Sequence, residues 1–259
     1  MKIGVFDSGL GGLTVLRCLW QALPGADYVY LGDTARVPYG IRSQDVIARY
    51  ARECFQFLIE QSIDLCVVAC NTVSAYALDA LQAQCDIPII GVVEPGVEAV
   101  IASAPQSAIG IVGTEATIRS QAYESRLLRA LPHLPVFSSA CPLFVPLVEE
   151  GWFDHPVTRQ VVESYMGHFK AQAVDAIVLG CTHYPLLKPL IQEVMGAHVR
   201  LIDSAEATAT EVRRRFGDRI GAREGHTSFF VTDQADRFDR IASLFLGKTY
   251  GPVTQVSVG

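Results

Sequence analysis

Short runs of consecutive apolar residues recur along the chain, and stretches in which apolar residues have helical spacing separate them. Apolar runs rich in β-branched residues are typical of strands that a parallel sheet buries on both faces. The strand-like runs begin near Ile3, Tyr28, Leu65, Pro88, Ile109, Val136, Ala176 and Val199. Because strands and helices alternate, the pattern predicts an α/β fold with mainly parallel sheets.

The spacing of these runs indicates an internal duplication. The intervals between the first four runs are 25, 37 and 23 residues, and those between the last four are 27, 40 and 23 residues. The segment Ile3-Gly-Val-Phe-Asp-Ser8 also aligns with Ile109-Gly-Ile-Val-Gly-Thr114. We therefore expect one α/β unit of four strands to occur twice in the chain.

The carboxy-terminal part of the chain has elements of its own. Residues 205–216 predict a helix, residues 226–232 a strand and residues 233–246 a capped amphipathic helix. Roughly fifty residues are too few for an independent domain. We therefore expect this part to pack on one of the two repeats.

Charge and hydropathy narrow the possible partners and compartment. The net charge is −6, and the basic triplet Arg213-Arg214-Arg215 lies in a helical pattern that predicts a solvated helix face, so nucleic acid is not an expected partner. Residues 87–113, the longest apolar stretch, are interrupted by Glu, Pro and Gly, so we expect no membrane span. Seven cysteines and a start without signal-peptide features predict free thiols in the cytoplasm.

Cys70 and Cys181 occupy equivalent positions in the two repeats, 111 residues apart. Each follows a strand-like run and precedes hydrogen-bonding side chains, in Ala69-Cys-Asn-Thr72 and Gly180-Cys-Thr-His183. Open α/β sheets bind ligands at the carboxyl ends of their strands, so we expect a site with a thiol on each side. The helix expected after each cysteine favours a lowered thiol pKa, whereas burial would raise the pKa of both thiols unless helix dipoles and Asp7 or His183 compensate.

The other five cysteines have simpler interpretations. Buried thiols are common in protein cores, so structural roles are expected for Cys18, Cys54, Cys66 and Cys85. Cys141 lies in a loop before a proline, and its role stays open.

Polar segments also follow the first two strand-like runs. Asp7 is either a helix cap or a carboxylate that faces the same cleft as Cys70. The glycines at positions 9, 11 and 12 are suited to an anion site at a helix start, but Thr14 stands where a dinucleotide fingerprint requires a third glycine. The loop of residues 32–40 is either a ligand contact or an ordinary connection.

The local sequence does not decide which residues are the acid or base partners of the two thiols. His183 lies two residues after Cys181, and Glu149 and Glu150 follow an apolar loop, but each also has an ordinary structural explanation. Zinc binds cysteine and histidine, yet the residues that follow Cys70 carry only amide and hydroxyl groups, which are poor zinc ligands. We therefore expect no metal.

Four motifs together resemble those of the glutamate racemases, which belong to the cofactor-independent aspartate/glutamate racemase superfamily. They are Phe6-Asp-Ser-Gly-Leu-Gly-Gly12, Gly32-Asp-Thr-Ala-Arg-Val-Pro-Tyr-Gly40, Ala69-Cys-Asn-Thr-Val-Ser-Ala75 and Leu179-Gly-Cys-Thr-His-Tyr-Pro-Leu186. The resemblance implies two similar doubly wound α/β domains with mainly parallel sheets, related by a pseudo-twofold axis. Their expected limits are residues 1–97 with 207–259 and residues 98–206, and the active site is expected between them.

The resemblance also implies an activity and a role for individual residues. The expected reaction is the interconversion of L-glutamate and D-glutamate without a cofactor, which supplies D-glutamate for peptidoglycan synthesis. Cys70 and Cys181 would be the paired acid and base, with Asp7 assisting Cys70 and with His183 and Glu149 assisting Cys181. The residues expected to line the substrate are Asp7, Ser8, Tyr39, Gly40, Asn71, Thr72, Thr182 and His183. A homodimer is implied as well.

Elementary chemistry agrees with this interpretation. Inversion of an α-carbon requires a base on one face and an acid on the other, and two thiols across a cleft supply both. Racemases that use pyridoxal phosphate need a lysine for the Schiff base, and only Lys188 lies near a motif here.

Two alternatives remain. An aspartate racemase of the same superfamily would use the same chemistry with a different pocket for the distal carboxylate, although the fuller match at residues 38–40 and 181–185 favours glutamate. A two-lobed amino-acid-binding protein would need no thiol on each face, and such proteins are usually exported.

Overall fold

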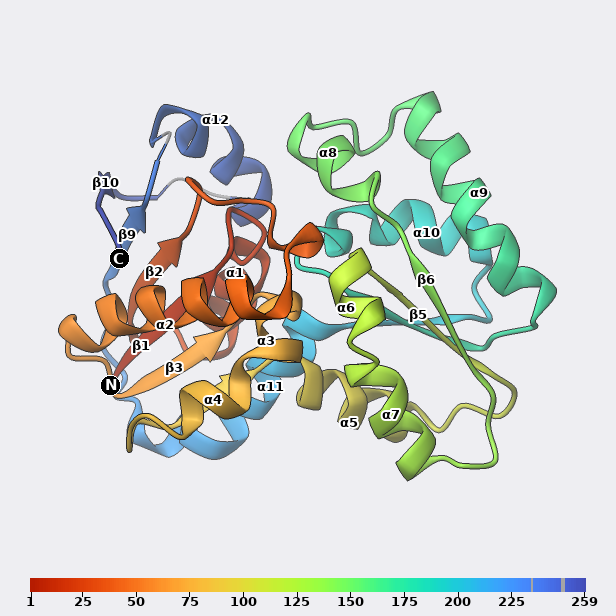
Figure 1. Cartoon of the computed structure of the whole chain (residues 1–259), viewed down its shortest axis with the longest axis horizontal. Coiled ribbons are helices and arrows are strands. Elements are labelled where there is room, and N and C mark those ends of the chain that lie inside the picture. Colours follow the sequence, from red (N-terminus) through yellow and green to blue (C-terminus); the bar gives the residue numbers. More distant parts are fainter. Residues whose placement is uncertain (234, 248–249) are drawn as a thin grey trace.

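The strands of the chain form two parallel sheets, which lie side by side as the centres of two lobes (Figure 1). In the computed structural model, which describes residues 1–233, 235–247 and 250–259, the first sheet has the order β10-β9-β2-β1-β3-β4 and the second the order β6-β5-β7-β8. The strands are β1 (Lys2–Asp7), β2 (Asp27–Gly32), β3 (Leu65–Val68), β4 (Ile89–Gly91), β5 (Ile109–Gly113), β6 (Val136–Ala140), β7 (Ala176–Gly180), β8 (Arg200–Asp203), β9 (Thr227–Val231) and β10 (Val253–Gln255).

The strand order repeats the duplication in the sequence. The block β2-β1-β3-β4 of the first sheet has the same order as β6-β5-β7-β8 of the second. Each predicted strand-like run corresponds to one of these strands, and all their pairings are parallel. The predicted α/β fold with two parallel sheets is confirmed.

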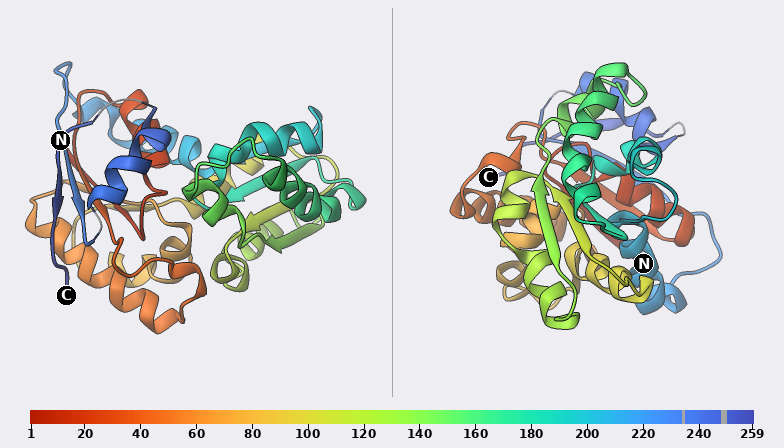
Figure 2. Two further views of the ribbon diagram at one scale, coloured as in Figure 1. Left: turned by 90° about the horizontal axis from the view of Figure 1, so that it is seen from above. Right: turned by 90° about the vertical axis from the view of Figure 1, so that its right-hand side faces the viewer.

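Helices connect successive strands and flank both sheets (Figures 1 and 2). They are α1 (Leu13–Ala22), α2 (Gln44–Glu60), α3 (Asn71–Tyr76), α4 (Leu78–Gln82), α5 (Val93–Ser103), α6 (Glu115–Arg119), α7 (Ala122–Ala130), α8 (Phe144–Glu149), α9 (Pro156–Ala171), α10 (Lys188–Met195), α11 (Ser204–Phe216) and α12 (Ala235–Leu246). Short 3-10 helices occur at η1 (Tyr39–Ile41), η2 (Tyr184–Leu187) and η3 (Gly217–Arg219). Within the described residues, no helix is both long enough and apolar enough to cross a membrane.

The alternation of side chains along the strands explains why helices cover both faces of the first sheet. Successive residues of a strand point to opposite faces. Ile3 and Val5 of β1 belong to the same apolar cluster as the buried face of α1, whereas Phe6 belongs to the cluster that contains the buried face of α2. Both faces are therefore apolar, and each is buried by its own helices.

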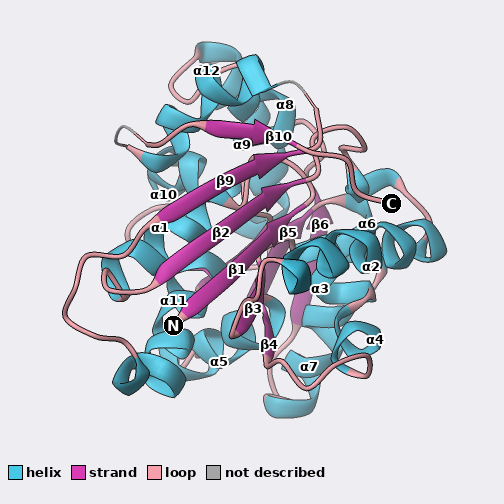
Figure 3. Ribbon diagram, turned by 90° about the vertical axis from the view of Figure 1, so that its left-hand side faces the viewer, coloured by secondary structure: helices cyan, strands magenta, loops and turns pink. Residues whose placement is uncertain are grey.

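The carboxy-terminal segment extends the first sheet (Figure 3). Strand β9 pairs in parallel with β2, and β10 pairs with β9 at the edge of the sheet. The predicted helix of residues 205–216 begins one residue earlier, where the Asp203 carboxylate accepts the Ala205 N–H at 2.8 Å. The predicted helix of residues 233–246 is observed from Ala235 on, and its residue 234 lies outside the described residues.

The limits predicted for the two domains stay a prediction. The boundaries at 97/98 and 206/207 each fall within a helix, α5 and α11, and these two helices pack against each other. Strand β10 has no counterpart among the predicted elements, because three residues at an exposed sheet edge leave too short an apolar pattern.

Candidate active site

A cavity of about 140 Å³ lies where the carboxyl ends of strands from both sheets meet. Residues that follow β1, β2 and β3 line one side, and residues that follow β5, β6 and β7 line the other. The predicted residues in the lining are Ser8, Tyr39, Gly40, Cys70, Asn71, Thr72, Cys181, Thr182 and His183. The structure thus brings the two cysteines of the repeats to a single cavity.

Cys70 ends the segment after β3 and is the N-cap residue of α3. Its side chain is buried, and its thiol donates a hydrogen bond to Ser8 Oγ at 3.3 Å. Burial, reinforced by the nearby Asp7 carboxylate, raises the pKa of Cys70 to about 12. The expectation of a lowered pKa is therefore wrong for Cys70, because burial outweighs the effect of a helix of six residues.

Cys181 follows β7 and faces a buried histidine. Cys181 Sγ lies 3.8 Å from His183 Nδ1, and His183 Nε2 lies 3.1 Å from Glu149 Oε1. Burial disfavours the charged imidazole, but the hydrogen bonds with Cys181 and Glu149 outweigh it and raise the pKa of His183 to about 10. The ring is therefore cationic at neutral pH and has an N–H for each neighbour.

The structure distinguishes between the two adjacent glutamates. Glu149 is largely buried at the end of α8 and pairs with His183, whereas Glu150 is exposed. Glu149 lies behind His183 and outside the described lining of the cavity. The histidine ring lies between Glu149 and Cys181 and contacts both.

Asp7 also lies behind the lining, on the side of Cys70. It is buried, and its Oδ2 accepts the N–H of Gly9 at 2.8 Å. Its Oδ1 accepts a longer hydrogen bond of 3.4 Å from the Thr182 hydroxyl, which connects the end of β1 to the end of β7. Burial raises the pKa of Asp7, while the charge of His183 acts in the opposite direction.

The glycine-rich segment after β1 allows a close approach between the lobes. A Cβ atom at Gly11 would lie 2.2 Å from Thr182 Oγ1 and 2.5 Å from His183 Nδ1. No side chain fits at such distances. The close contact with residues 182–183 therefore requires glycine at this position.

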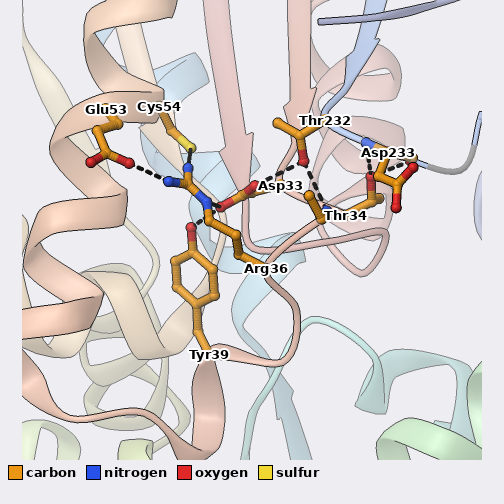
Figure 4. Close-up of polar contacts among 9 residues, drawn as sticks. Asp33, Thr34, Arg36, Tyr39, Glu53, Cys54, Thr232 and Asp233 are labelled. Carbon is orange, nitrogen blue, oxygen red and sulfur yellow. Dashed lines mark hydrogen bonds and ion pairs between the residues drawn. The ribbon is translucent and has the colours of Figure 1, made fainter. Parts of the chain in front are cut away.

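The loop after β2 is fixed by a buried carboxylate that the sequence analysis did not single out (Figure 4). Asp33 Oδ2 accepts hydrogen bonds from the Tyr39 hydroxyl and, at 2.6 Å, from Arg36 Nε, while Oδ1 accepts one from Thr232 Oγ1 at 2.8 Å. Arg36 also pairs with Glu53 of α2. The hydroxyl of Tyr39, a predicted substrate contact, is thus bound to Asp33.

Two further residues near the cavity were missed. Thr114 lines it and lies 3.1 Å from Thr72, oxygen to oxygen. The alignment of Thr114 with Ser8 in the repeat was the signal that could have identified it. Tyr123 of α7 donates a hydrogen bond of 2.6 Å to Asn71 Oδ1, and nothing local in the sequence indicates this contact.

The donors around the cavity are neutral, apart from His183. Among the described residues that line it, none is Lys or Arg. In the part of the chain that the structure describes, no group of three or more His, Cys, Asp or Glu side chains is arranged to hold a metal ion. The arrangement is suited to binding anionic groups through hydroxyl and amide donors while protons move to and from two thiols.

Comparison with known proteins places this fold and cavity in a family. The model of the Asp/Glu/hydantoin racemase family matches residues 3–212. The chain belongs to this family, and the resemblance found in the sequence is confirmed.

Individual members of the family are similar over nearly the whole chain. The glutamate racemase of Geobacter metallireducens is 48% identical over 260 residues, which cover 99% of this chain and 96% of that protein. The crystal structure of glutamate racemase isoform RacE1 from Bacillus anthracis has a TM-score of 0.93 at 37% identity and covers 98% of this chain and 97% of that one. The Francisella tularensis glutamate racemase in complex with D-glutamate has a TM-score of 0.92 at 35% identity, covering 99% and 97% of the two chains.

Proposed function

We propose that this protein interconverts L-glutamate and D-glutamate by proton transfer at the α-carbon between two cysteines. The observation that carries the proposal is the placement of Cys70 and Cys181 on one cavity, each at the end of an equivalent strand. The similarity to glutamate racemases over nearly the full chain supports glutamate as the substrate.

The two thiols have different environments, which suits opposite tasks in one turnover. In the direction from L-glutamate, Cys181 as thiolate removes the α-proton, and the Cys70 thiol donates its proton to the opposite face of the carbon. From D-glutamate, Cys70 is the base and Cys181 the acid. The cationic His183 stabilises negative charge on Cys181 through the 3.8 Å contact, and Glu149 holds the ring in place.

The remaining side chains hold the substrate and stabilise the charge that develops on it. Loss of the α-proton moves electrons towards the α-carboxylate, so fixed donors near that group lower the barrier. Ser8, Asn71, Thr72 and Thr182 supply hydroxyl and amide groups to the cavity. Burial and, to a smaller extent, the nearby Asp7 carboxylate raise the pKa of Cys70 and favour the protonated thiol as its resting form.

The biological setting follows from the reaction. D-glutamate formed in the cytoplasm would supply peptidoglycan synthesis. The thiols of the protein itself act as acid and base, so the proposed reaction needs no cofactor. The homodimer that the resemblance implies is tested by the mass of the purified protein in solution.

Proton NMR in D₂O tests the substrate directly. L-glutamate and, in parallel, L-aspartate are incubated with the purified protein and no added cofactor. We expect the α-proton signal of glutamate to disappear while optical rotation falls towards zero. Exchange of aspartate alone would identify an aspartate racemase, and exchange of neither would contradict the proposal for both acids.

Serine variants test the role of the thiols. We expect Cys70→Ser and Cys181→Ser each to lower the racemisation rate by at least about a hundredfold, because a hydroxyl is a far weaker acid and base. Cys85→Ser, at a partly buried thiol outside the described lining, is the matched control. Retention of turnover in either active-site variant would exclude the two-thiol mechanism.

A further inference from the structure

The carboxamide of Asn71 is only half satisfied. Asn71 follows Cys70, lines the cavity and is 2% exposed. Its Oδ1 accepts a hydrogen bond, whereas its Nδ2 finds no hydrogen-bond partner among the described residues. A buried donor without a partner is costly, so an amide that lines a cavity in this way is expected to meet a ligand there.

Tyr123 is the donor to the other end of this amide. Its hydroxyl lies 2.6 Å from Asn71 Oδ1 and 3.4 Å from the Val92 carbonyl oxygen, and the Ser204 hydroxyl, which donates to the Leu179 carbonyl, is a third hydrogen-bonding neighbour. A hydroxyl has one hydrogen to donate, and the shorter contact is to Asn71. Burial raises the pKa of Tyr123, so the hydroxyl keeps its proton and stays a donor.

The ring of Tyr123 is held where glycines leave room for it. A Cβ atom at Gly96 of α5 would lie 3.0 Å from Tyr123 Cε1, and one at Gly180 would lie 3.4 Å from Cε2. Tyr123 is 1% exposed and lies outside the described lining of the cavity. Its position is therefore fixed by packing, and its described hydrogen bond to a residue of the cavity lining is the one to Asn71.

An asparagine amide presents a donor at one end and an acceptor at the other, and rotation by half a turn exchanges them. A fixed donor at Oδ1 favours the orientation in which Nδ2 is left free. We propose that Tyr123 is a positioning residue, which holds the Asn71 amide so that Nδ2 donates a hydrogen bond to a carboxylate of bound glutamate. This inference rests on the proposed function and adds to it a residue from α7.

A double-mutant cycle tests the inference. The proteins are the wild type, Tyr123→Phe, Asn71→Ala and the variant with both changes, and calorimetric titration with racemic glutamate gives Kd. The racemate keeps its composition during turnover, and interconversion of enantiomers releases no heat. Tyr28→Phe is the control, because Tyr28 is also a buried tyrosine whose hydroxyl donates to backbone carbonyls, away from the cavity.

If Tyr123 acts through Asn71, its effect on binding depends on the presence of that amide. We expect Tyr123→Phe to weaken binding about three- to tenfold, the loss of about one hydrogen bond. The same change in the Asn71→Ala background is expected to alter Kd by less than about twofold. An unchanged Kd in Tyr123→Phe, or an equal effect in both backgrounds, would overturn the inference.

A second readout does not depend on affinity. The side-chain amide signals of Asn71 in a ¹⁵N–¹H spectrum are assigned by their loss in Asn71→Ala. We expect one sharp pair in the wild type that shifts when glutamate is added, and a broadened or displaced pair in Tyr123→Phe. Identical spectra of Tyr123→Phe and the wild type would contradict the inference. If the wild type binds no glutamate, the proposed function itself fails and this inference falls with it.

Discussion

Glu149 and His183 form a buried pair in which the carboxylate oxygen Oε1 lies 3.1 Å from the ring nitrogen Nε2. The other ring nitrogen lies 3.8 Å from Cys181 Sγ. One carboxylate, one imidazole and one thiol thus form a chain that ends at the cavity. Phe245 of α12 packs against the imidazole in a T-shaped arrangement with ring centroids 5.5 Å apart, so the histidine is confined on a further side.

The first prediction concerns stability and pH. The pKa of His183 is raised to about 10, above the ordinary value of 6.5, so the pair stabilises the fold fully below pH 6.5 and loses this contribution as pH rises towards 10. We expect Glu149→Gln to lower the free energy of unfolding by about 1–3 kcal/mol near neutral pH, and by less at higher pH. Denaturant unfolding at several pH values measures this difference.

Glu150→Gln is the matched control for that experiment, because Glu150 is the exposed neighbour on the same turn. We expect the free energy of unfolding of Glu150→Gln to equal that of the wild type at every pH. A Glu149→Gln variant whose destabilisation grows with pH would contradict a raised pKa of His183.

The second prediction concerns Gly11. Alanine at this position would place a carbon atom 2.2 Å from Thr182 Oγ1, so the contact between the two lobes must open. We expect Gly11→Ala to cost about 1–3 kcal/mol of stability and to lower kcat/KM together with it. Because the two enantiomers of glutamate have equal free energies, kcat/KM must fall by the same factor in both directions.

A glycine with free space around it is the matched control for replacing glycine by alanine. Gly167 lies in α9, and a Cβ atom there would meet nothing within 4 Å. We expect Gly167→Ala to leave kcat/KM unchanged and to stabilise the helix by up to about 1 kcal/mol. Wild-type kinetics and stability in Gly11→Ala would show that the close approach at Gly11 is not required.

The third prediction separates two roles of Tyr39. Its hydroxyl donates to Asp33, within the cluster that joins the loop after β2 to Arg36 and Thr232 (Figure 4). We therefore expect Tyr39→Phe to lower the free energy of unfolding by about 1–2 kcal/mol and to change KM by less than about twofold. Asp33→Asn, which removes the charge that pairs with Arg36, should cost more stability than Tyr39→Phe. A large rise in KM for Tyr39→Phe at unchanged stability would instead place the hydroxyl on the substrate.

The sequence predicted the strands and the meeting of Cys70 and Cys181, because apolar runs and their polar ends are local patterns. It named Asp7 and Glu149 through the resemblance, but it did not single out Asp33 or Tyr123. Asp33 is held by Thr232, which is 199 residues away in the chain, and Tyr123 reaches Asn71 across 52 residues. Such contacts arise from packing between elements.

The pKa of Cys70 shows the same limit of sequence analysis. The position of the cysteine before α3 was predicted correctly, and a helix start alone favours the thiolate. Burial decides the direction of the shift in the pKa of Cys70, and the charge of the nearby Asp7 carboxylate adds to it. Glu149 and Glu150 are adjacent in the sequence, and the structure distinguishes them because Glu149 pairs with His183 whereas Glu150 is exposed.

Two thiols that act on opposite faces of the same α-carbon leave a distinct isotope pattern in the product. The protein is equilibrated in D₂O, where its thiols become deuterated, and L-glutamate with an α-protium is added. We expect the first D-glutamate formed to carry deuterium at the α-carbon, while the remaining L-glutamate still carries protium. Early D-glutamate that retains the original protium would show that a single base returns the same proton, and would contradict the account.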